Sequence, residues 1–315
     1  MICIINPSVD SALGLAAEEY LLSIAKEDCF MLWQSDEAII IGRNQNAWSQ
    51  VNAQVVRKKE IPVIRRISGG GTVYHDMGNV NFTFIRPFQK FPQVAYEPFL
   101  RPVQSFLEGL GVPASFEGKS DLAVNGLKIS GNAQHIHKNK VLHHGTLLFD
   151  ANLSTLSEAL RVSEGKYTGK AVDSIRKKVV NIRPFLKSDM TVENFMSRFM
   201  AGMMRENNGR RGVLSPADRA AINDIAINRY DRWDWNFGRG PDYGFQNYTD
   251  RYAIRFEVRS GFLQNVKISG DGLSTQVERK LETALTGCKH RFEDMVEVMG
   301  HIDSSPVDEL IRAMF

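Results

Sequence analysis

Three neighbouring stretches between residues 121 and 149 constrain the fold of this chain most strongly. They predict three consecutive antiparallel strands with turns at Asn125-Gly126 and at residues 138–140, because asparagine followed by glycine is typical of a two-residue hairpin. Further β-rich runs precede them: FMLW, EAIIIGR and IPVIRR, then TVYH and VNFTFI, which we interpret as a hairpin around DMGN. The pattern indicates an α+β fold with mixed, largely antiparallel sheets flanked by helices.

Helices are expected where apolar residues recur every three or four positions. Asp10 or Ser11 can cap a helix that runs to about Lys26, and residues 96–110 repeat the pattern. The run NAQVVRKKE is also helix-like. Two later helices are expected to begin at capping residues, Thr191 and Ser215-Pro216.

The length of 315 residues favours two compact domains over one. The segment WDWNFGRGPDYGF, residues 233–245, crowds aromatic residues, glycines and a proline between a predicted helix and a new pair of strands. We place the domain boundary there. The prediction is a large domain over residues 1–245 and a small α+β domain over residues 246–315, with two strands and up to three helices.

Charge and apolar runs exclude several classes of protein. The net charge is only +3 and the longest basic run is residues 176–178, unlike the basic patch of a nucleic-acid binder. No segment approaches the roughly 18 consecutive apolar residues of a membrane span. The N-terminus lacks the basic start of a secretion signal. We therefore expect a cytoplasmic protein that binds neither nucleic acid nor membrane.

The cysteines and histidines predict no metal site or disulfide framework. Cys3, Cys29 and Cys288 lie far apart in sequence, and none belongs to a CxxC pair. Four histidines would be split between two faces of a hairpin, so we expect no zinc: His135, His137, His143 and His144.

The run RRISGGGTVYHDMGNVNF, residues 65–82, places three glycines directly after a predicted strand. It matches neither the GxxxxGK[ST] phosphate loop nor the GxGxxG dinucleotide fingerprint, so a P-loop or Rossmann enzyme is not expected. Glycines let a ligand approach the backbone closely, and Arg65 and Arg66 bring positive charge just upstream. Taken alone, a tight turn with exposed arginines explains the run better.

The two turns assign side chains of the three strands to faces. With a two-residue first turn and a three-residue second turn, the expected pairs are Lys128 with Ala123, Ser130 with Asp121, Gln134 with His144 and Asn132 with Thr146. One face would carry Asp121, Lys128, Ser130, Asn132, Gln134, His144 and Thr146, and the opposite face the apolar Ile129, Ala133, Leu147 and Phe149. A two-residue second turn would instead flip the third strand.

Lys128 is the candidate catalytic residue on that polar face. A lone lysine on a strand is usually solvated, but here polar neighbours accompany it. A lysine beside Asp121 suits a phosphate with a metal ion, because the ammonium neutralises oxygen charge as it builds up while the carboxylate can hold magnesium.

Five segments, in this order, resemble one family, the lipoate-protein ligases. They are the run at residues 65–82, KISGN at 128–132, HHGTLLF at 143–149, GKAVDSIRKKVVNI at 169–182 and WDWNFG at 233–238. The resemblance covers nearly the whole chain and implies a catalytic domain over residues 1–245 with the fold of biotin and lipoate ligases. The remaining residues, 246–315, would be an accessory domain that moves between adenylation and transfer.

The resemblance also implies roles for individual residues. Lys128 would be the essential lysine, in contact with the acyl carbonyl and the adenylate phosphate. The implied lipoyl-binding residues are Arg65, Ser68, Gly69, Gly70, Gly71, His75, Asn79 and His144. The implied ATP and adenylate contacts are Gly70, Val73, Tyr74, Asp121, Lys128, Ser130, Gly131, Thr146, Lys170, Val172 and Ser174. The loop at residues 169–174 would close over the adenosine. That Asp121 holds Mg²⁺ is a separate hypothesis, which rests on its predicted cross-strand position.

The reaction implied by the resemblance uses lipoic acid, ATP and Mg²⁺. Lipoate would first become lipoyl-AMP, and the lipoyl group would then pass to a lysine of a carrier domain. The expected carriers are the glycine cleavage H protein and the E2 subunits of 2-oxoacid dehydrogenases, and a monomer is expected. His75 and His144 are candidates for the base that takes the amine proton.

Four alternatives remain open at this stage. A transferase that uses a pre-activated lipoyl or octanoyl donor would share every acyl-pocket motif. A cysteine-dependent amidotransferase needs a thiol near the pocket, yet no cysteine lies between Cys29 and Cys288. A non-catalytic binder of carrier domains would not need Lys128. Biotin ligation is disfavoured because the arginines here precede the glycine triplet.

Overall fold

The computed structural model describes residues 1–88, 95–160, 166–175, 177–303 and 306–315. The chain forms two compact units, each assembled from three separate segments. The large unit comprises Met1–Arg43, Pro62–Leu156 and Ile175–Asp231, and the small unit comprises Asn44–Ile61, Ser157–Ser174 and Arg232–Phe315.

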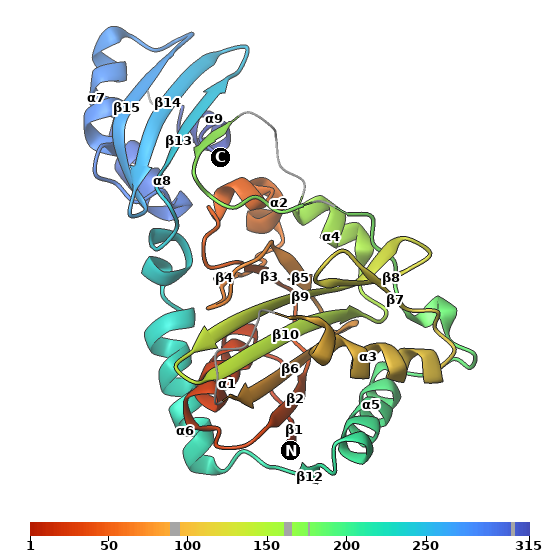
Figure 1. Ribbon diagram of the computed structural model, residues 1–315. Helices are drawn as coiled ribbons and strands as arrows, with labels where there is room; N and C mark the ends of the chain where they lie inside the picture. Colours follow the sequence, from red (N-terminus) through yellow and green to blue (C-terminus); the bar gives the residue numbers. More distant parts are fainter. Residues whose placement is uncertain (89–94, 161–165, 176, 304–305) are drawn as a thin grey trace. The chain divides into compact units, whose positions relative to one another are not determined.

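An eight-stranded sheet forms the centre of the large unit, in the order β12-β1-β2-β6-β10-β9-β8-β7 (Figure 1). Its strands are β1 (Ile2–Ile5), β2 (Cys29–Trp33), β6 (Asn79–Pro87), β7 (Ser115–Glu117), β8 (Asp121–Val124), β9 (Leu127–His137), β10 (Lys140–Leu148) and β12 (Arg210–Arg211). Only the pairs of β1 with β2 and with β12 are parallel. The prediction of a mixed, largely antiparallel sheet is confirmed.

Helices cover both faces of this sheet (Figure 1). On one face, α3 (Glu97–Gly109) and α5 (Val192–Glu206) pack against the apolar side chains of the main core, which include Phe82, Phe84 and Leu147. On the other, α1 (Ser11–Ile24) contacts β6 and β10. The helix α6 (Pro216–Ile225) and the π-helical turn η3 (Ala226–Tyr230) pack on α1, and the short η2 (Arg183–Phe185) lies before α5 in sequence.

The predicted helix starts are confirmed because each capping side chain accepts the expected backbone N–H. Asp10 accepts from Leu13, and Thr191 accepts from Asn194. Ser215 forms a complete capping box with Asp218, in which each side chain accepts from the other residue's backbone.

A second, three-stranded sheet has the order β4-β3-β5, with strands β3 (Ala38–Ile41), β4 (Val63–Arg65) and β5 (Val73–His75). The predicted hairpin of TVYH with VNFTFI is therefore wrong: β5 pairs with β3, whereas β6 pairs with β2 and β10. The DMGN turn does not fold back because it packs on residues 150–152, where Asp76 accepts from Asn152 N. The chain instead passes from one sheet to the other.

The small unit has a four-stranded antiparallel sheet in the order β11-β13-β14-β15. Its elements are η1 (Trp48–Gln50), α2 (Ala53–Lys58), β11 (Tyr167–Gly169), η4 (Asp234–Gly238), β13 (Tyr243–Tyr248), β14 (Tyr252–Arg259), β15 (Phe262–Gly270), α7 (Thr275–Leu285), α8 (Phe292–Gly300) and α9 (Val307–Ala313), and α4 (Leu153–Ala159) runs into it from the preceding segment. The three helices expected after residue 246 are present as α7, α8 and α9, but the strands number three and not two, because β13 spans that position ahead of β14 and β15.

The registers of β8, β9 and β10 differ from the predicted ones at two places. Lys128 does pair with Ala123, but a bulge between Leu122 and Ala123 shifts the following pair, so Ser130 faces Leu122 and not Asp121. The second turn has two residues, so His144 faces Ala133 and not Gln134.

These two errors have opposite effects on the predicted polar face. Because side chains alternate along a strand, the bulge moves Ser130, Asn132 and Gln134 to the core face. The shorter turn then returns His144 and Thr146 to the face of Lys128 and Asp121. The predicted grouping is thus wrong for three residues and correct for the other four.

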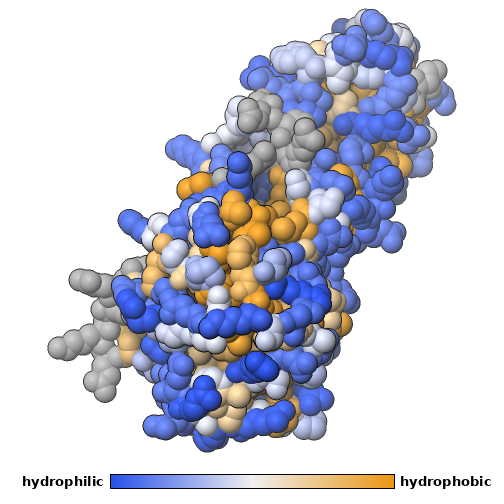
Figure 2. Space-filling model, turned by 90° about the vertical axis from the view of Figure 1, so that its right-hand side faces the viewer, coloured by the Kyte–Doolittle hydropathy of each residue, from blue (hydrophilic) through white to orange (hydrophobic). Residues whose placement is uncertain are grey.

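Figure 2 shows hydrophilic side chains over most of the face that it presents, with one large group of apolar side chains and several smaller ones. In the described part of the chain, no helix is long and apolar enough to cross a membrane.

Gly78 offers a test of the crossing between the two sheets. A Cβ added at this position would lie 2.0 Å from the main-chain oxygen of Asp150, so Gly78→Ala must displace backbone. We expect a loss of about 1–3 kcal/mol in the free energy of unfolding, as for other overpacked sites. Urea unfolding of the full chain measures it. The matched control is Gly109→Ala, where nothing lies within 4 Å; equal midpoints for the two variants would contradict the packing described here.

Candidate active site

The glycine run is held in place by a buried guanidinium. Arg66 donates from Nη2 to the carbonyls of Gly69 and Gly71, both at 2.6 Å, and from Nη1 to Ile40 O at 3.0 Å. Gly70 between them has φ +86°, a conformation that favours glycine. Burial lowers the pKa of Arg66 to about 10, which still leaves it charged at neutral pH. The arginine is therefore part of the wall and not an exposed cation.

Arg65 is buried as well, and its Nη1 donates to Gly42 O at 3.0 Å and Arg43 O at 3.2 Å. Burial lowers the pKa of Arg65 to about 10. The expectation of exposed arginines beside a tight turn is therefore wrong: both guanidinium groups bind main-chain carbonyls.

A buried hydrogen-bonded chain connects this loop to α1 and β10. Ser68 Oγ lies 2.7 Å from His144 Nε2, and His144 Nδ1 lies 2.7 Å from Glu18 Oε2. The other oxygen of Glu18 accepts from Thr83 Oγ1 at 2.5 Å, and Arg66 Nε donates to Ser68 Oγ at 2.9 Å. A proton on Nδ1 of His144, with Nε2 accepting from Ser68, satisfies every partner in this chain. Both ring nitrogens of His144 are thus committed.

His75 lies at the end of β5 against Trp33, with ring centroids 5.5 Å apart. Burial, with Arg66 and His144 nearby, lowers the pKa of His75 to about 3, so the imidazole is neutral. Within the described residues its Nδ1 has no hydrogen-bond partner, although it is buried. Such an atom can bind a ligand or a water molecule. Asn79, also buried, donates to Asn81 Oδ1 at 2.8 Å.

Two lysines share one carboxylate on the same sheet face. Lys128 Nζ lies 3.2 Å from Asp121 Oδ1, and Lys177 Nζ lies 3.0 Å from Asp121 Oδ2. Lys177 also contacts Glu117 at 3.3 Å, and its hydrogen bond to Asp121 is the main cause of its raised pKa. The backbone of Lys128 is tied to residues 178–180 by two hydrogen bonds. The two ammonium groups can bind an anion such as a phosphate.

The glycine loop and the lysine pair occupy adjoining parts of this face. A Cβ at Gly70 would lie 3.6 Å from Ala133 Cβ, and one at Gly131 would lie 3.0 Å from Lys128 Nζ and 3.7 Å from Val73 Cγ1. Gly131 N donates to Thr146 Oγ1 at 3.3 Å. The structure therefore brings together most of the large-unit residues expected to bind the acyl group and the adenylate.

Two predicted contacts are oriented differently. Ser130 lies on the core face, where Asn132 Nδ2 donates to its hydroxyl at 3.0 Å. The hydroxyl of Tyr74 donates to Glu37 at 2.7 Å, and its side chain lies on the opposite face of β5 from that of Val73. Burial raises the pKa of Tyr74.

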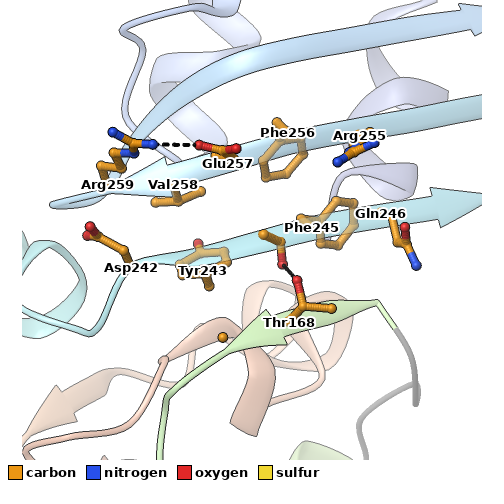
Figure 3. Close-up of a pocket in the computed structure, with 12 residues that line it drawn as sticks. Thr168, Asp242, Tyr243, Phe245, Gln246, Arg255, Phe256, Glu257, Val258 and Arg259 are labelled. Atoms are coloured by element: carbon orange, nitrogen blue, oxygen red, sulfur yellow. Dashed lines mark hydrogen bonds and ion pairs between the residues drawn. The ribbon is translucent and has the colours of Figure 1, made fainter.

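Lys170, Val172 and Ser174 belong to the small unit. Figure 3 shows another part of that unit, a hollow of about 450 Å³ that is lined by Thr168 of β11 and by residues of β13 and β14 such as Arg255 and Glu257. None of the predicted site residues lines it.

The chain matches two family models. Lipoyl protein ligase A/B catalytic domain matches residues 10–204, and bacterial lipoate protein ligase C-terminus matches residues 251–311. Lipoate-protein ligase 1 of Staphylococcus aureus is 36% identical, with 98% of each chain covered, and lipoate-protein ligase LplJ of Bacillus subtilis is 36% identical, with 95% of this chain and 93% of that one covered. The chain belongs to the lipoate-protein ligase family. It is an enzyme, as predicted.

Solved structures of lipoate-protein ligases share its fold. Plasmodium falciparum LipL1 in complex with lipoate covers 98% of both chains with a TM-score of 0.64 at 23% identity. A lipoate-protein ligase A bound with ATP gives 0.63 at 21%, covering 76% of this chain and 98% of that one. The ligase of Thermoplasma acidophilum, from a study with its E2 lipoyl domain, gives 0.65 at 22%, covering 76% and 96%. The fold prediction is confirmed.

Several site residues of this family member were missed from the sequence. Glu18 and Thr83 lie far in sequence from their partners and belong to no recognisable motif. Lys177 lies in the segment at residues 169–182, but its pairing with Asp121 was not predicted. The only signal was the polar residue at position 18 on the apolar side of a predicted helix. In the described residues no group of three or more His, Cys, Asp or Glu is placed to hold a metal ion.

Cys29 tests the cysteine-dependent alternative. It is buried on β2, and burial is the main cause that raises its pKa to about 12, so its thiolate is scarce at neutral pH. We expect Cys29→Ser to transfer lipoyl groups at close to the wild-type rate. Titration of the native protein with a thiol reagent should leave Cys29 unreacted, whereas the denatured protein should react at all 3 cysteines. Loss of transfer in Cys29→Ser, with normal folding, would support the thioester mechanism.

Proposed function

We propose that this chain activates lipoate with ATP, forms lipoyl-AMP and transfers the lipoyl group to a lysine of a carrier domain. The observation that carries the proposal is the pair Lys128 and Lys177 on Asp121, beside the loop that Arg66 holds. Family membership and relatives solved with lipoate and with ATP support the substrates.

The first step joins two anions, so charge neutralisation is the main need. A lipoate carboxylate oxygen attacks the α-phosphorus of ATP, and the bond to pyrophosphate breaks. Lys128 and Lys177 lie where two ammonium groups can offset the charge on the phosphate oxygens. Asp121 is the shared partner of both lysines, and the phosphate would replace this carboxylate as their partner.

Asp121 was expected to hold Mg²⁺, and its surroundings do not fit that role. Each of its carboxylate oxygens already accepts from an ammonium group, at 3.2 and 3.0 Å. A divalent cation at Asp121 would have to displace both lysines from the carboxylate. The lysines carry the step as proposed here, and magnesium would accompany ATP through the phosphate oxygens.

In the second step the amine of a carrier lysine attacks the acyl carbon, and the bond to AMP breaks. The amine nitrogen loses a proton to water, and AMP leaves as an anion. Neither histidine suits the role of general base: both nitrogens of His144 are engaged, and a conjugate acid with a pKa of about 3 makes His75 a weak base. We propose that the buried histidines line the acyl channel with Ser68 and Asn79.

The wider assignments are proposals of the same kind. Residues 1–245 would act as the catalytic domain and residues 246–315 as the accessory domain. The loop with Lys170, Val172 and Ser174 would cover the adenosine. Glycine cleavage H protein and E2 subunits are the proposed carriers, with a monomer as the active form; the Thermoplasma ligase studied with its E2 lipoyl domain supports a carrier domain of this class.

Reconstitution tests the main proposal. The full chain, lipoate, Mg-ATP and a purified carrier domain should yield a carrier heavier by one lipoyl group in a mass spectrum. Lys128→Ala should lose adenylate formation by at least about a hundredfold, as for other charge-stabilising groups. Exchange of pyrophosphate into ATP separates the alternatives: transfer from lipoyl-AMP without exchange would favour a transferase that uses a pre-activated donor. No adenylate and no transfer by the wild type would sink the proposal.

Lys177 tests the role of a second cation. Lys177→Gln removes one charge-assisted contact, so we expect pyrophosphate exchange to slow about tenfold, equivalent to roughly 1.4 kcal/mol. The matched control is Lys178→Gln, because the exposed Lys178 contributes only its backbone carbonyl to Lys128. Equal rates for the two variants would remove Lys177 from the reaction.

A further inference from the structure

Three successive residues of the small unit, Val172, Asp173 and Ser174, are each hydrogen-bonded to a segment more than a hundred residues away. These contacts lie within one compact unit and involve residues 44–50. The same three residues lie in the loop that the proposed function puts over adenosine. Nothing in the spacing of the sequence links the two segments.

Gln50 makes the densest set of these contacts. Its Oε1 accepts from the backbone N of Ser174 at 3.1 Å and from the Ser174 hydroxyl at 2.6 Å. Its Nε2 donates to Asp173 Oδ1 at 3.2 Å and to Ser49 Oγ at 3.0 Å. Gln50 is only 6% exposed, so the amide is committed to these protein partners.

Gln45 and Asn44 hold the remaining residue of the loop. The backbone N of Val172 donates to Asn44 O at 3.1 Å, and Gln45 Nε2 donates to Val172 O at 3.2 Å. Gln45 Nε2 also lies 3.0 Å from Gln50 Oε1 and from Ser174 Oγ. Both glutamines are therefore joined to the loop and to each other.

The segment that contains Gln45 and Gln50 is itself held in place by aromatic packing. Trp48, two residues before Gln50, stacks on Phe237 with centroids 4.7 Å apart and meets the ring of Phe315 at 4.8 Å. Its Nε1 donates to His290 O at 3.0 Å. The short η1 helix is thus anchored in the aromatic core of the small unit, and the loop at residues 172–174 is attached to this anchored element.

We propose that Gln45 and Gln50 are positioning residues that hold residues 172–174 in the conformation that closes over the nucleotide. The proposal rests on the proposed function, because it assigns that loop to the adenosine. The glutamines do not touch the reacting atoms. Gln50 accepts from the backbone N of Ser174 and Gln45 donates to the carbonyl of Val172, so the two side chains fix the backbone of the loop. The closed loop keeps water from the mixed anhydride of lipoyl-AMP.

Gln50→Leu in the full-length protein removes every side-chain hydrogen bond of this residue at similar volume. Amide hydrogen exchange of the peptide covering residues 166–175 should rise about tenfold in the free protein, because Ser174 N loses its acceptor. The KM for ATP should rise about tenfold while kcat changes less, and more AMP should be released per lipoyl group transferred. The matched control is Gln54→Leu, an exposed position of α2.

An exchange of the two side chains separates positioning from general destabilisation. Gln50→Glu alone sets two carboxylates at the contact that now measures 3.2 Å, so the loop should loosen. Combining it with Asp173→Asn restores a donor and an acceptor in reversed order, and the double variant should recover the wild-type KM for ATP and exchange rate. A structural defect at position 50 would not be repaired by a change at position 173.

The outcomes are distinct. Unchanged exchange of residues 166–175 in Gln50→Leu would overturn the contact itself, whatever the activity. Faster exchange with an unchanged KM and unchanged AMP release would overturn the positioning role. If the wild type makes no adenylate, the proposed function fails and the positioning role fails with it, while the exchange measurement still reports on the contact.

Discussion

The buried guanidinium of Arg66 is the interaction on which the shape of the candidate acyl site depends. A desolvated charge is stable only when hydrogen bonds replace the lost water, and here these bonds go to the carbonyls of Ile40, Gly69 and Gly71 and to the hydroxyl of Ser68. The same bonds fix a glycine loop that has few side-chain contacts of its own. The arginine and the loop therefore need each other, and the nearby Glu18 supplies a compensating negative charge.

The chain from Ser68 through His144 to Glu18 extends that constraint across the sheet. It links the loop to β10 and to α1, and Thr83 of β6 completes it. Each member is buried and each has a defined donor or acceptor, so that a change in one leaves an unsatisfied group in another. This connectivity makes the wall of the site rigid before any ligand arrives.

Local patterns predicted the elements well, because caps and turns are decided by neighbours in sequence. Asp10, Thr191 and Ser215 cap the helices expected of them, and the Asn125-Gly126 turn is present. The partners of β5 could not be predicted, since the pairing with the buried strand β3 and the packing of Gly78 on Asp150 decide them and both are long-range. His144 reached the expected face only because a bulge and a shorter turn shift the register in opposite senses.

The site residues also divide into those that a local motif predicts and those that depend on long-range contacts. Lys128, the glycines and His75 stand in contiguous motifs, whereas Glu18, Lys177 and Gln50 act through contacts that span about 55 to 125 residues of sequence. Each of these three polar groups binds a partner that only the folded chain brings near. A single sequence does not show which distant residues form such a pair.

The acid–base properties of the site agree with the chemistry that it would perform. Burial keeps His75 neutral, and both ring nitrogens of His144 are engaged in hydrogen bonds. Cys29, the cysteine nearest in sequence to the glycine loop, is kept protonated by burial. What the site offers instead is fixed positive charge from two lysines and fixed main-chain geometry from two arginines. Joining a carboxylate to a phosphate moves no proton, so a site of this kind gains most from preorganised charge and from exclusion of water. The first step therefore needs no general base, and the proton of the second step would pass from the amine to water.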